Sequence, residues 1–112
     1  MAKLERELQG DAESFINYIH QGIVGGSISA TYEDGSDWRD GDTRVITRVY
    51  ERYSWLGGNR VSLSVTLVAR GRSLFLSAIS AGGSQAMFFK INTFGEQSFL
   101  NKLDNLVSRY DG

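Results

Sequence analysis

Hydrophobic and polar residues alternate at the start of the chain. Ala2, Leu4 and Leu8 occupy every second position together with Arg6, and charged or amide side chains fill the positions between them. A period of two is typical of a β-strand. Charged side chains are frequent on edge strands, because they discourage pairing with another chain. We therefore predict a short edge strand over residues 2–9, which ends at Gly10.

The hydrophobic period changes after Gly10. Asp11 is a good N-cap residue, and the apolar residues that follow recur at helical spacing: Phe15, Ile16, Ile19 and Ile23. The pair Gly25 and Gly26 ends this pattern. The sequence predicts an amphipathic helix between Asp11 and Gly25.

Three further segments are predicted between residues 27 and 55. We predict a strand over residues 27–33, a loop over residues 34–42 with the sequence DGSDWRDGD, and a strand over residues 43–55 that is rich in Val, Ile, Thr and Tyr. The length of the next loop decides which face of the third segment is buried. A two-residue loop would bury Ile46 and Tyr50 beside three arginines. A three-residue loop, Gly57 to Asn59, would bury Val45, Val49 and Tyr53 instead, and we favour it because burying arginines is costly.

The next strands are placed by their turns. Residues 60–69 alternate strictly, and Gly71-Arg72 and Gly82-Gly83 both fit two-residue hairpin turns. The Gly82-Gly83 pair is not expected to hold phosphate, because a strand, and not a helix, is predicted to follow it. The expected pairs across the two turns are Ala69 with Leu74, Leu67 with Leu76, Val65 with Ala78, Ala78 with Met87, Leu76 with Phe89, and Leu74 with Ile91.

The chain ends in a pattern with a helical period. Its apolar stripe consists of Phe99, Leu100, Leu103, Leu106, Val107 and Tyr110. The predicted order is strand, helix, five strands, helix. This order indicates a single α+β domain over residues 1–112, with one antiparallel sheet and a long C-terminal helix packed across one face.

Composition narrows the possible chemistry. The 112 residues include no cysteine and one histidine, and the net charge is −1. Thiol chemistry and cysteine-bound metal are excluded, and this charge gives no general attraction to nucleic acid or to anionic lipid. The first residues lack the apolar core of a signal peptide, and no run is long enough to span a membrane. We expect a cytoplasmic protein.

Few residues offer a candidate catalytic or metal site. The acidic residues of the predicted loop, from Glu33 to Asp42, lack the spacing of an EF-hand. His20 has no nucleophile beside it in a known motif, so we expect neither an enzyme nor a cofactor or metal. Arg44, Arg48 and Arg52 share one strand face, either as a solvated face with acidic partners or as a contact for nucleic acid. The net charge favours the solvated face.

Two long segments resemble a known family. The segments VYERYSWLGGNRVSLSVTL and LFLSAISAGGSQAMFFKINTFGEQSFL are similar to the central motifs of a family of short, uncharacterised bacterial proteins, a domain of unknown function. The order of the predicted elements also resembles a shortened helix-grip fold, as in the birch-pollen-allergen domains. That resemblance implies an apolar ligand held between the C-terminal helix and the sheet.

Two binding hypotheses follow. In the first, an apolar outer sheet face mediates homodimer formation or binds a protein partner, through Trp38, Phe75, Ile79 and Phe88. This hypothesis requires that the N-terminal helix does not cover that face. In the second, the protein carries a small apolar ligand between the C-terminal helix and the sheet, lined by Val65, Leu76, Phe89, Leu103 and Tyr110. We favour the first.

Overall fold

The computed structural model describes residues 2–25, 30–54, 59–82 and 89–110, without the side chains of residues 53, 54, 59 and 89–98. It contains one five-stranded antiparallel sheet and two helices, so the α+β class and the single sheet are confirmed. The elements are β1 (Ala2–Gln9), α1 (Ala12–Val24), β2 (Thr31–Asp40), β3 (Thr43–Ser54), β4 (Asn59–Arg70), β5 (Ser73–Gly82) and α2 (Phe89–Ser108).

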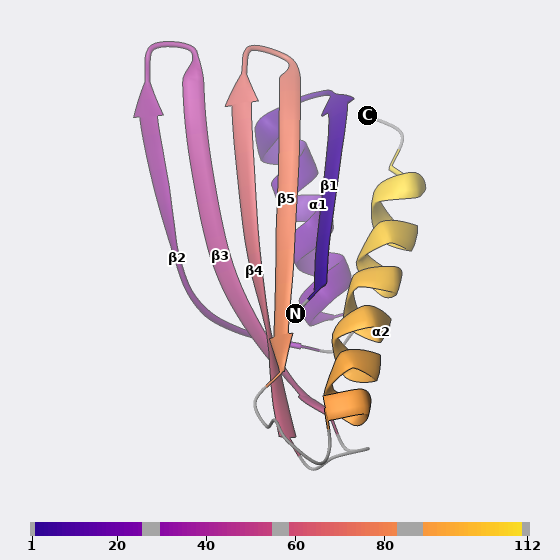
Figure 1. Ribbon diagram of the computed structural model, residues 1–112. Coiled ribbons are helices and arrows are strands. Elements are labelled where there is room, and N and C mark those ends of the chain that lie inside the picture. The colour runs from indigo at the N-terminus through magenta and orange to yellow at the C-terminus, as the bar shows by residue number, and fades with distance from the viewer. Residues whose placement is uncertain (1, 26–29, 55–58, 83–88, 111–112) are drawn as a thin grey trace.

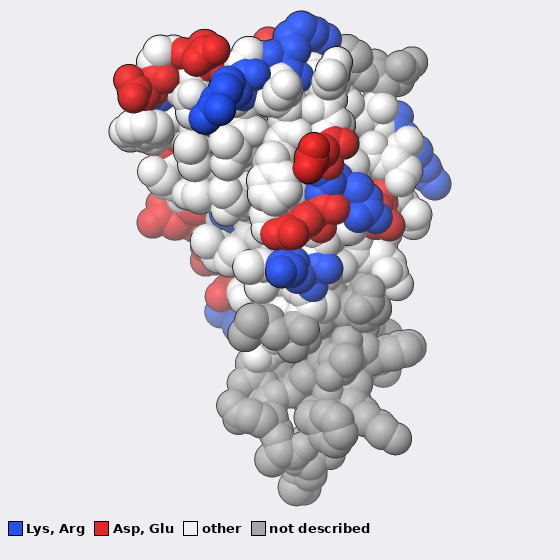
Figure 2. Space-filling view, turned by 45° about the horizontal axis from the view of Figure 1, so that its top comes forward, with Lys and Arg blue, Asp and Glu red and all other residues white. Residues whose placement is uncertain are grey.

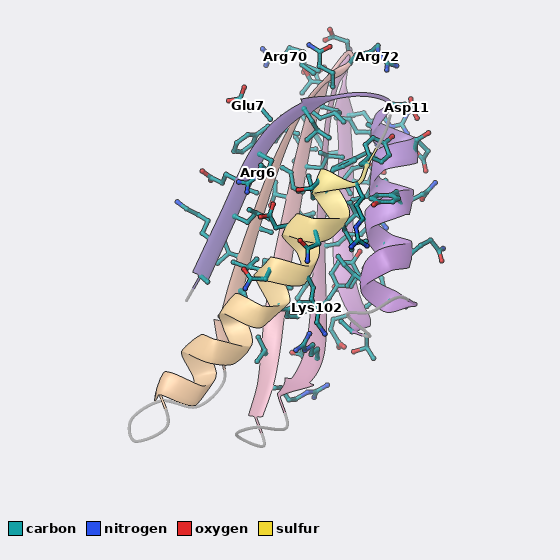
Figure 3. The ribbon with its side chains drawn as sticks, turned by 90° about the vertical axis from the view of Figure 1, so that its right-hand side faces the viewer. Arg6, Glu7, Asp11, Arg70, Arg72 and Lys102 are labelled. Carbon is teal, nitrogen blue, oxygen red and sulfur yellow. The ribbon has the colours of Figure 1, made fainter. Side chains whose placement is uncertain are left out.

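Both helices lie on the same side of the sheet. The strand order is β1-β5-β4-β3-β2. In the view of Figure 1, α1 lies behind the sheet and α2 stands to the right of β1. The side view in Figure 3 shows the sheet as one layer and the two helices as a second. We call the helix-covered side the inner face and the opposite side the outer face. α1 does not cover the outer face, so the condition for the first binding hypothesis is met.

The core fills the space between the inner face and the helices. The C-terminal stripe behaves as predicted, because Phe99, Leu100 and Leu103 are buried, and Leu106, Val107 and Tyr110 pack against the core. The other buried apolar residues are Leu4, Phe15, Ile16, Ile19, Ile23, Ala30, Ile46, Tyr50, Val61, Leu63, Val65, Leu67, Ala69, Leu74, Leu76 and Ala78. Among the described residues, no helix is long and apolar enough to cross a membrane.

The first strand and the first helix form where the sequence predicts them. β1 is an edge strand, and the carboxylate of Asp11 accepts a hydrogen bond from the backbone N–H of Ser14 at 2.9 Å. This bond satisfies one of the unpaired donors of the first helical turn. Gly10 connects the two elements, and its N–H donates to the carbonyl of Arg72 at 2.9 Å. The connection therefore also ties β1 to the turn between β4 and β5.

The hairpin of β4 and β5 has the predicted register. Ala69 pairs with Leu74, Leu67 with Leu76, and Val65 with Ala78. Gly71 has a φ of 60°, a conformation that residues other than glycine rarely adopt. The two-residue turn therefore aligns the apolar sides of both strands on the inner face.

A strand was predicted after the Gly82-Gly83 turn, over residues 85–92; it is wrong from Phe89 on, because α2 begins there, and residues 85–88 lie outside the described part of the chain. β1 occupies the edge of β5 that this strand was expected to take, with Leu4 beside Ala78, Arg6 beside Leu76 and Leu8 beside Leu74. Because one sheet edge accepts only one strand, β1 is the strand that pairs with this edge of β5, in place of residues 85–92. Gly82 ends β5, whereas Gly83 and Met87 lie outside the described residues.

The predicted loop over residues 34–42 is also wrong. β2 runs to Asp40, and only Gly41 and Asp42 remain as the turn to β3. A shift in register at Tyr32 and Asp34 accommodates the irregular polar sequence. Of the strand predicted over residues 27–33, residues 27–29 lie outside the described part of the chain.

The buried face of β3 is opposite to the one we favoured. Ile46 and Tyr50 are buried, whereas Val45 and Val49 are only half-buried and lie on the outer face. Ser54 pairs with Asn59, so four residues, 55–58, separate β3 from β4. An even number of loop residues places the same side chains of β3 on the inner face as a two-residue loop would. The conformation of residues 55–58 lies outside the described residues. Arg44, Arg48 and Arg52 consequently share the inner face.

Specific contacts of Arg44 and Arg52 offset part of the cost of that placement, whereas Nη1 of Arg52 is buried without a hydrogen-bond partner among the described residues. Arg44 donates to both carboxylate oxygens of Asp37, at 3.0 and 2.6 Å, and to Glu13 of α1 at 2.8 Å. This arrangement holds the pKa of Asp37 below its usual value. Arg52 lies over the ring of Phe99, 5.2 Å from its centroid. Arginines are therefore tolerated where the inner face meets the helices, because they are paired or stacked.

Candidate protein-binding surface

The centre of the outer face carries no charged side chain. Each of the three central strands contributes three consecutive outer positions, which we call the outer block: Val45, Thr47 and Val49 on β3, Ser64, Thr66 and Val68 on β4, and Phe75, Ser77 and Ile79 on β5. Helices cover only the inner face, so no described element covers the outer block.

The strand register arranges these residues in rows that cross the sheet. The first row runs Trp38, Val45, Val68, Phe75, Glu7. The second row runs Ser36, Thr47, Thr66, Ser77, Glu5, and the third runs Asp34, Val49, Ser64, Ile79, Lys3. Two mainly apolar rows therefore flank a row of small hydroxyl side chains, and charge is confined to the outermost strands.

Large apolar side chains on this face remain accessible to solvent. Trp38 is 55% exposed and Ile79 is 38% exposed. Val45, Val68 and Phe75 are half-buried by their neighbours on the same face. In Figure 2 the outer face is an uncharged white surface, with charged side chains gathered at the hairpin ends and toward the β1 side. An uncharged surface with exposed large apolar side chains is typical of a protein contact.

A hollow interrupts the outer face near β1. It has a volume of about 480 Å³ and is lined by Glu7, Val68, Arg70, Ser73, Leu74 and Phe75. Val68 and Phe75 form an apolar floor, whereas Glu7 and Arg70 bring opposite charges to its rim. Figure 3 shows Glu7 pointing away from the helices, while Arg6 beside it lies on the α2 side. The hollow combines an apolar floor with a hydrogen-bond acceptor and a cation.

Three of the four predicted interface residues lie on this surface. Trp38, Phe75 and Ile79 all occupy outer positions, on β2 and β5. Trp38 belongs to a regular strand and not to the tip of a loop, which is a correction to its expected setting. Phe88 lies outside the described residues.

The residues predicted to line a ligand site belong to the core. Val65, Leu76 and Leu103 are at most 1% exposed. The ring of Tyr110 packs against Phe15 and Tyr18, with centroids 4.9 and 5.1 Å away. The side chain of Phe89 lies outside the described residues.

His20 contacts a group of polar aromatic residues between α1 and the sheet. Its Nδ1 lies 2.9 Å from the hydroxyl of the buried Tyr50, and its ring packs edge-on against Tyr32. Burial lowers the pKa of His20, and the positive charge of Arg48 lowers it further. Burial also raises the pKa of Tyr50. A neutral imidazole accepting a hydrogen bond from Tyr50 fits both shifts, and this arrangement links α1 to β3.

The acidic residues once predicted to form a loop are distributed over both faces. Asp37 faces inward and pairs with Arg44, whereas Asp34 and Asp40 occupy outer positions on β2. Within the described ranges, no three histidine or acidic side chains lie close enough together to hold a metal ion. The alternation of β2 separates residues that are adjacent in the sequence.

Sequence reasoning missed the β3 and β4 part of the outer surface. Val45 and Val49 were assigned to the core, and Val68 was not identified as an interface residue. The strict alternation of β4 already placed Val68 opposite to the core residues Leu67 and Ala69. Val45 and Val49 could have been assigned to the outer face only if the loop between β3 and β4 had been known to contain an even number of residues.

The family of the chain can be stated from its sequence. The model of a family of unknown function, DUF6054, matches residues 1–111, and the chain belongs to this family. No curated protein and no solved structure matches the chain, so the resemblance to the helix-grip fold remains an expectation.

Proposed function

We propose that this protein is a non-enzymatic binding domain that forms a homodimer through the outer face of its sheet. The observation that carries the proposal is the outer block, an uncharged surface on three adjacent strands that no described helix or strand covers. Trp38 and Ile79 are large apolar side chains exposed on the same face. Association would remove this apolar area from water, which is the main driving force of stable protein contacts.

The size of the face suits a second copy of the same chain. Five strands at about 4.8 Å spacing and about eight residues at 3.3 Å rise give a flat area of roughly 600 Å². A stable interface buries about 800 Å² of accessible surface on each partner, and the accessible surface of a side-chain layer exceeds its flat area. A face-to-face pair of sheets is the arrangement of a β-sandwich, with the two layers about 10 Å apart.

Binding explains the face better than catalysis does. The hydroxyl of Ser77 donates to the carboxylate of Glu5 at 3.3 Å, but the outer block brings no histidine or lysine to that pair and otherwise offers only hydroxyl and apolar groups. The alternative, a carrier of a small apolar ligand, would use Val65, Leu76 and Leu103, which already contact other core side chains. A bacterial cytoplasmic setting is part of the proposal and agrees with a sequence without cysteine.

The test is the oligomeric state of the purified protein and of a variant with a charge in the outer block. We expect twice the monomer mass in native mass spectrometry and a concentration-dependent dimer in sedimentation equilibrium. Phe75→Glu places a carboxylate in the centre of the contact, so it should yield a monomer with an unchanged circular dichroism spectrum. Ile79→Glu, on the third row, serves as a second variant.

The matched control is Gln21→Glu, which adds the same charge to an exposed position of α1. The control should remain a dimer. A wild-type protein that is monomeric at every concentration overturns the proposal. A monomer with extra mass that disappears on denaturation overturns it as well, and supports the ligand carrier instead.

A further inference from the structure

The symmetry of a face-to-face dimer is restricted by the order of the strands. β4 is the central strand, with β3 and β2 on one side and β5 and β1 on the other. A two-fold axis parallel to β4 places β3 over β5 of the second copy and β2 over β1. Rotation about an axis preserves the position along that axis, so each row faces the same row of the second copy.

This axis matches side chains of the same character in the outer block. In the first row Val45 faces Phe75 of the second copy, and Val68 faces its own equivalent. In the second row Thr47 faces Ser77, so hydroxyl groups meet hydroxyl groups that can donate and accept. In the third row Val49 faces Ile79. Apolar rows therefore meet apolar rows, and the polar row meets the polar row.

Charge at the sheet edges also favours this axis. Lys3 on β1 faces Asp34 on β2 of the second copy, and the pair occurs twice in the dimer. An axis perpendicular to the strands would instead place each outermost strand over its own equivalent. Lys3 would then face Glu7 of the second copy, so both axes bring Lys3 to a carboxylate, but Glu5 would face Glu5. That contact between like charges is unfavourable near a desolvated interface and is absent with the parallel axis.

The same axis brings Trp38 to the hollow near β1. Trp38 and Glu7 stand at opposite ends of the first row, so Trp38 of one copy faces Glu7 of the other. An inclination of about 30° between the sheets moves an edge residue by roughly 5 Å along the strand, less than the spacing of one row. The hollow has a volume of about 480 Å³ and is open toward solvent, so an indole from the second copy can lie in it without displacing a described side chain.

We propose that Trp38 of each copy inserts into the hollow formed by Glu7, Val68, Arg70 and Phe75 of the other copy, about a two-fold axis parallel to β4. This inference rests on the proposed homodimer and names its symmetry and its anchor. The carboxylate of Glu7, which Trp38 faces directly, accepts the indole N–H, and Phe75 on the neighbouring strand contacts the ring. Val68 and Arg70 line the far side of the hollow. Tryptophan and arginine in such pockets dominate the energy of many interfaces.

Cross-linking of single cysteines tests the axis, because the natural chain contains no cysteine. Thr66 lies on the axis, so in Thr66→Cys the two thiols face each other across a gap of about 10 Å between backbones. Ser36 lies two strands away, and its equivalent is then roughly 21 Å distant. A short bismaleimide should join Thr66→Cys into covalent dimers and leave Ser36→Cys uncoupled.

The outcomes separate this inference from the proposed function. Efficient coupling of Ser36→Cys in a dimeric protein overturns the parallel axis, because a perpendicular axis places Ser36 over its own equivalent. Loss of coupling in both variants while the dimer persists also overturns it and leaves the homodimer standing. A monomeric wild type overturns both.

The anchor is tested by Trp38→Ala with sedimentation equilibrium. One hot-spot contact changes the dissociation constant by about 30-fold, and each dimer contains two such contacts, so we expect a rise of roughly 900-fold. The control is Arg39→Ala, the next residue of β2, which occupies an inner position. Equal, small changes in the two variants overturn the role of Trp38, whatever the axis.

Discussion

On the inner face of the sheet β4 carries Leu63, Val65 and Leu67, each at most 1% exposed, whereas on its outer face the same strand carries Ser64, Thr66 and Val68. The inner positions are large and covered by two helices. The outer positions are smaller and face solvent in the single chain. The two sets alternate along one strand, so they share the same backbone and differ only in what covers them.

The comparison shows that the two faces have different roles in stability. The inner face contributes to folding of the single chain, because its apolar side chains leave water when α1 and α2 pack on it. The outer block contributes only when something covers it. A change on the inner face should therefore lower the free energy of unfolding, and a change on the outer face should mainly alter association.

The largest expected effect comes from truncating adjacent residues of β4 that face opposite sides. Leu67→Ala removes a fully buried side chain, so the free energy of unfolding should fall by about 2–5 kcal/mol. Val68→Ala should cost less than about 1 kcal/mol in the monomer, because its side chain is already partly in water. Urea unfolding of dilute, monomeric protein measures both. Equal losses would contradict the distinction between the two faces.

A smaller effect distinguishes the ion pairs of the two faces. The side chain of Arg44 is 14% exposed and binds Asp37 and Glu13. The side chain of Arg60, on the outer face, is 64% exposed and forms an ion pair with Glu51. Arg44→Met leaves two carboxylates without a partner and should cost about 1–3 kcal/mol, the range for hydrogen bonds to charged groups. Arg60→Met should cost about 0–1 kcal/mol.

The measurement is again chemical unfolding, now repeated in high salt. Salt screens exposed pairs more strongly than buried ones, so the difference between wild type and Arg44→Met should persist while that of Arg60→Met decreases. If Arg60→Met lowers the free energy of unfolding more than Arg44→Met does, the ion pairs of Arg44 do not stabilise the fold more than the exposed pair of Arg60.

Features with a local signal were predictable from the sequence. The N-cap at Asp11 and the turn at Gly71 each depend on one residue type in one place, and both are present. The alternation of residues 60–69 likewise assigned Leu67 to the core and Val68 to the other side. Phe75 and Ile79 were placed on the outer surface by the hairpin register, whereas Trp38 was predicted in a loop and lies on this surface because β2 is a strand.

Features that depend on competition between distant segments were not predictable in this way. Residues 85–92 alternate well enough for a strand, yet β1 pairs with the available edge of β5. Which side chains of β3 face inward depends on the even number of residues between β3 and β4. It also depends on Glu13 of α1, whose carboxylate pairs with the inward-facing Arg44. Loop parity and long-range ion pairs leave no periodic signal, so the β3 part of the outer surface was missed.

The smallest expected effect concerns the pH dependence of the inner face. His20 contacts Tyr50 and Tyr32, Arg48 adds positive charge nearby, and the pKa of His20 is lowered from its ordinary value of 6.5, first by burial and then by Arg48. Below pH 6.5 the unfolded chain binds a proton at His20 before the folded chain does. The free energy of unfolding should therefore be fully retained above pH 6.5 and fall as the pH drops below it.

His20→Gln isolates this contribution, because the glutamine can keep a hydrogen bond to Tyr50 without titrating. Urea unfolding on both sides of pH 6.5 should show a smaller decrease for the variant than for the wild type. The matched outer-face variant Ser64→Ala, at an exposed position, should keep the wild-type decrease. If His20→Gln loses as much stability as the wild type on acidification, the neutral His20 is not a stabilising element of the inner face.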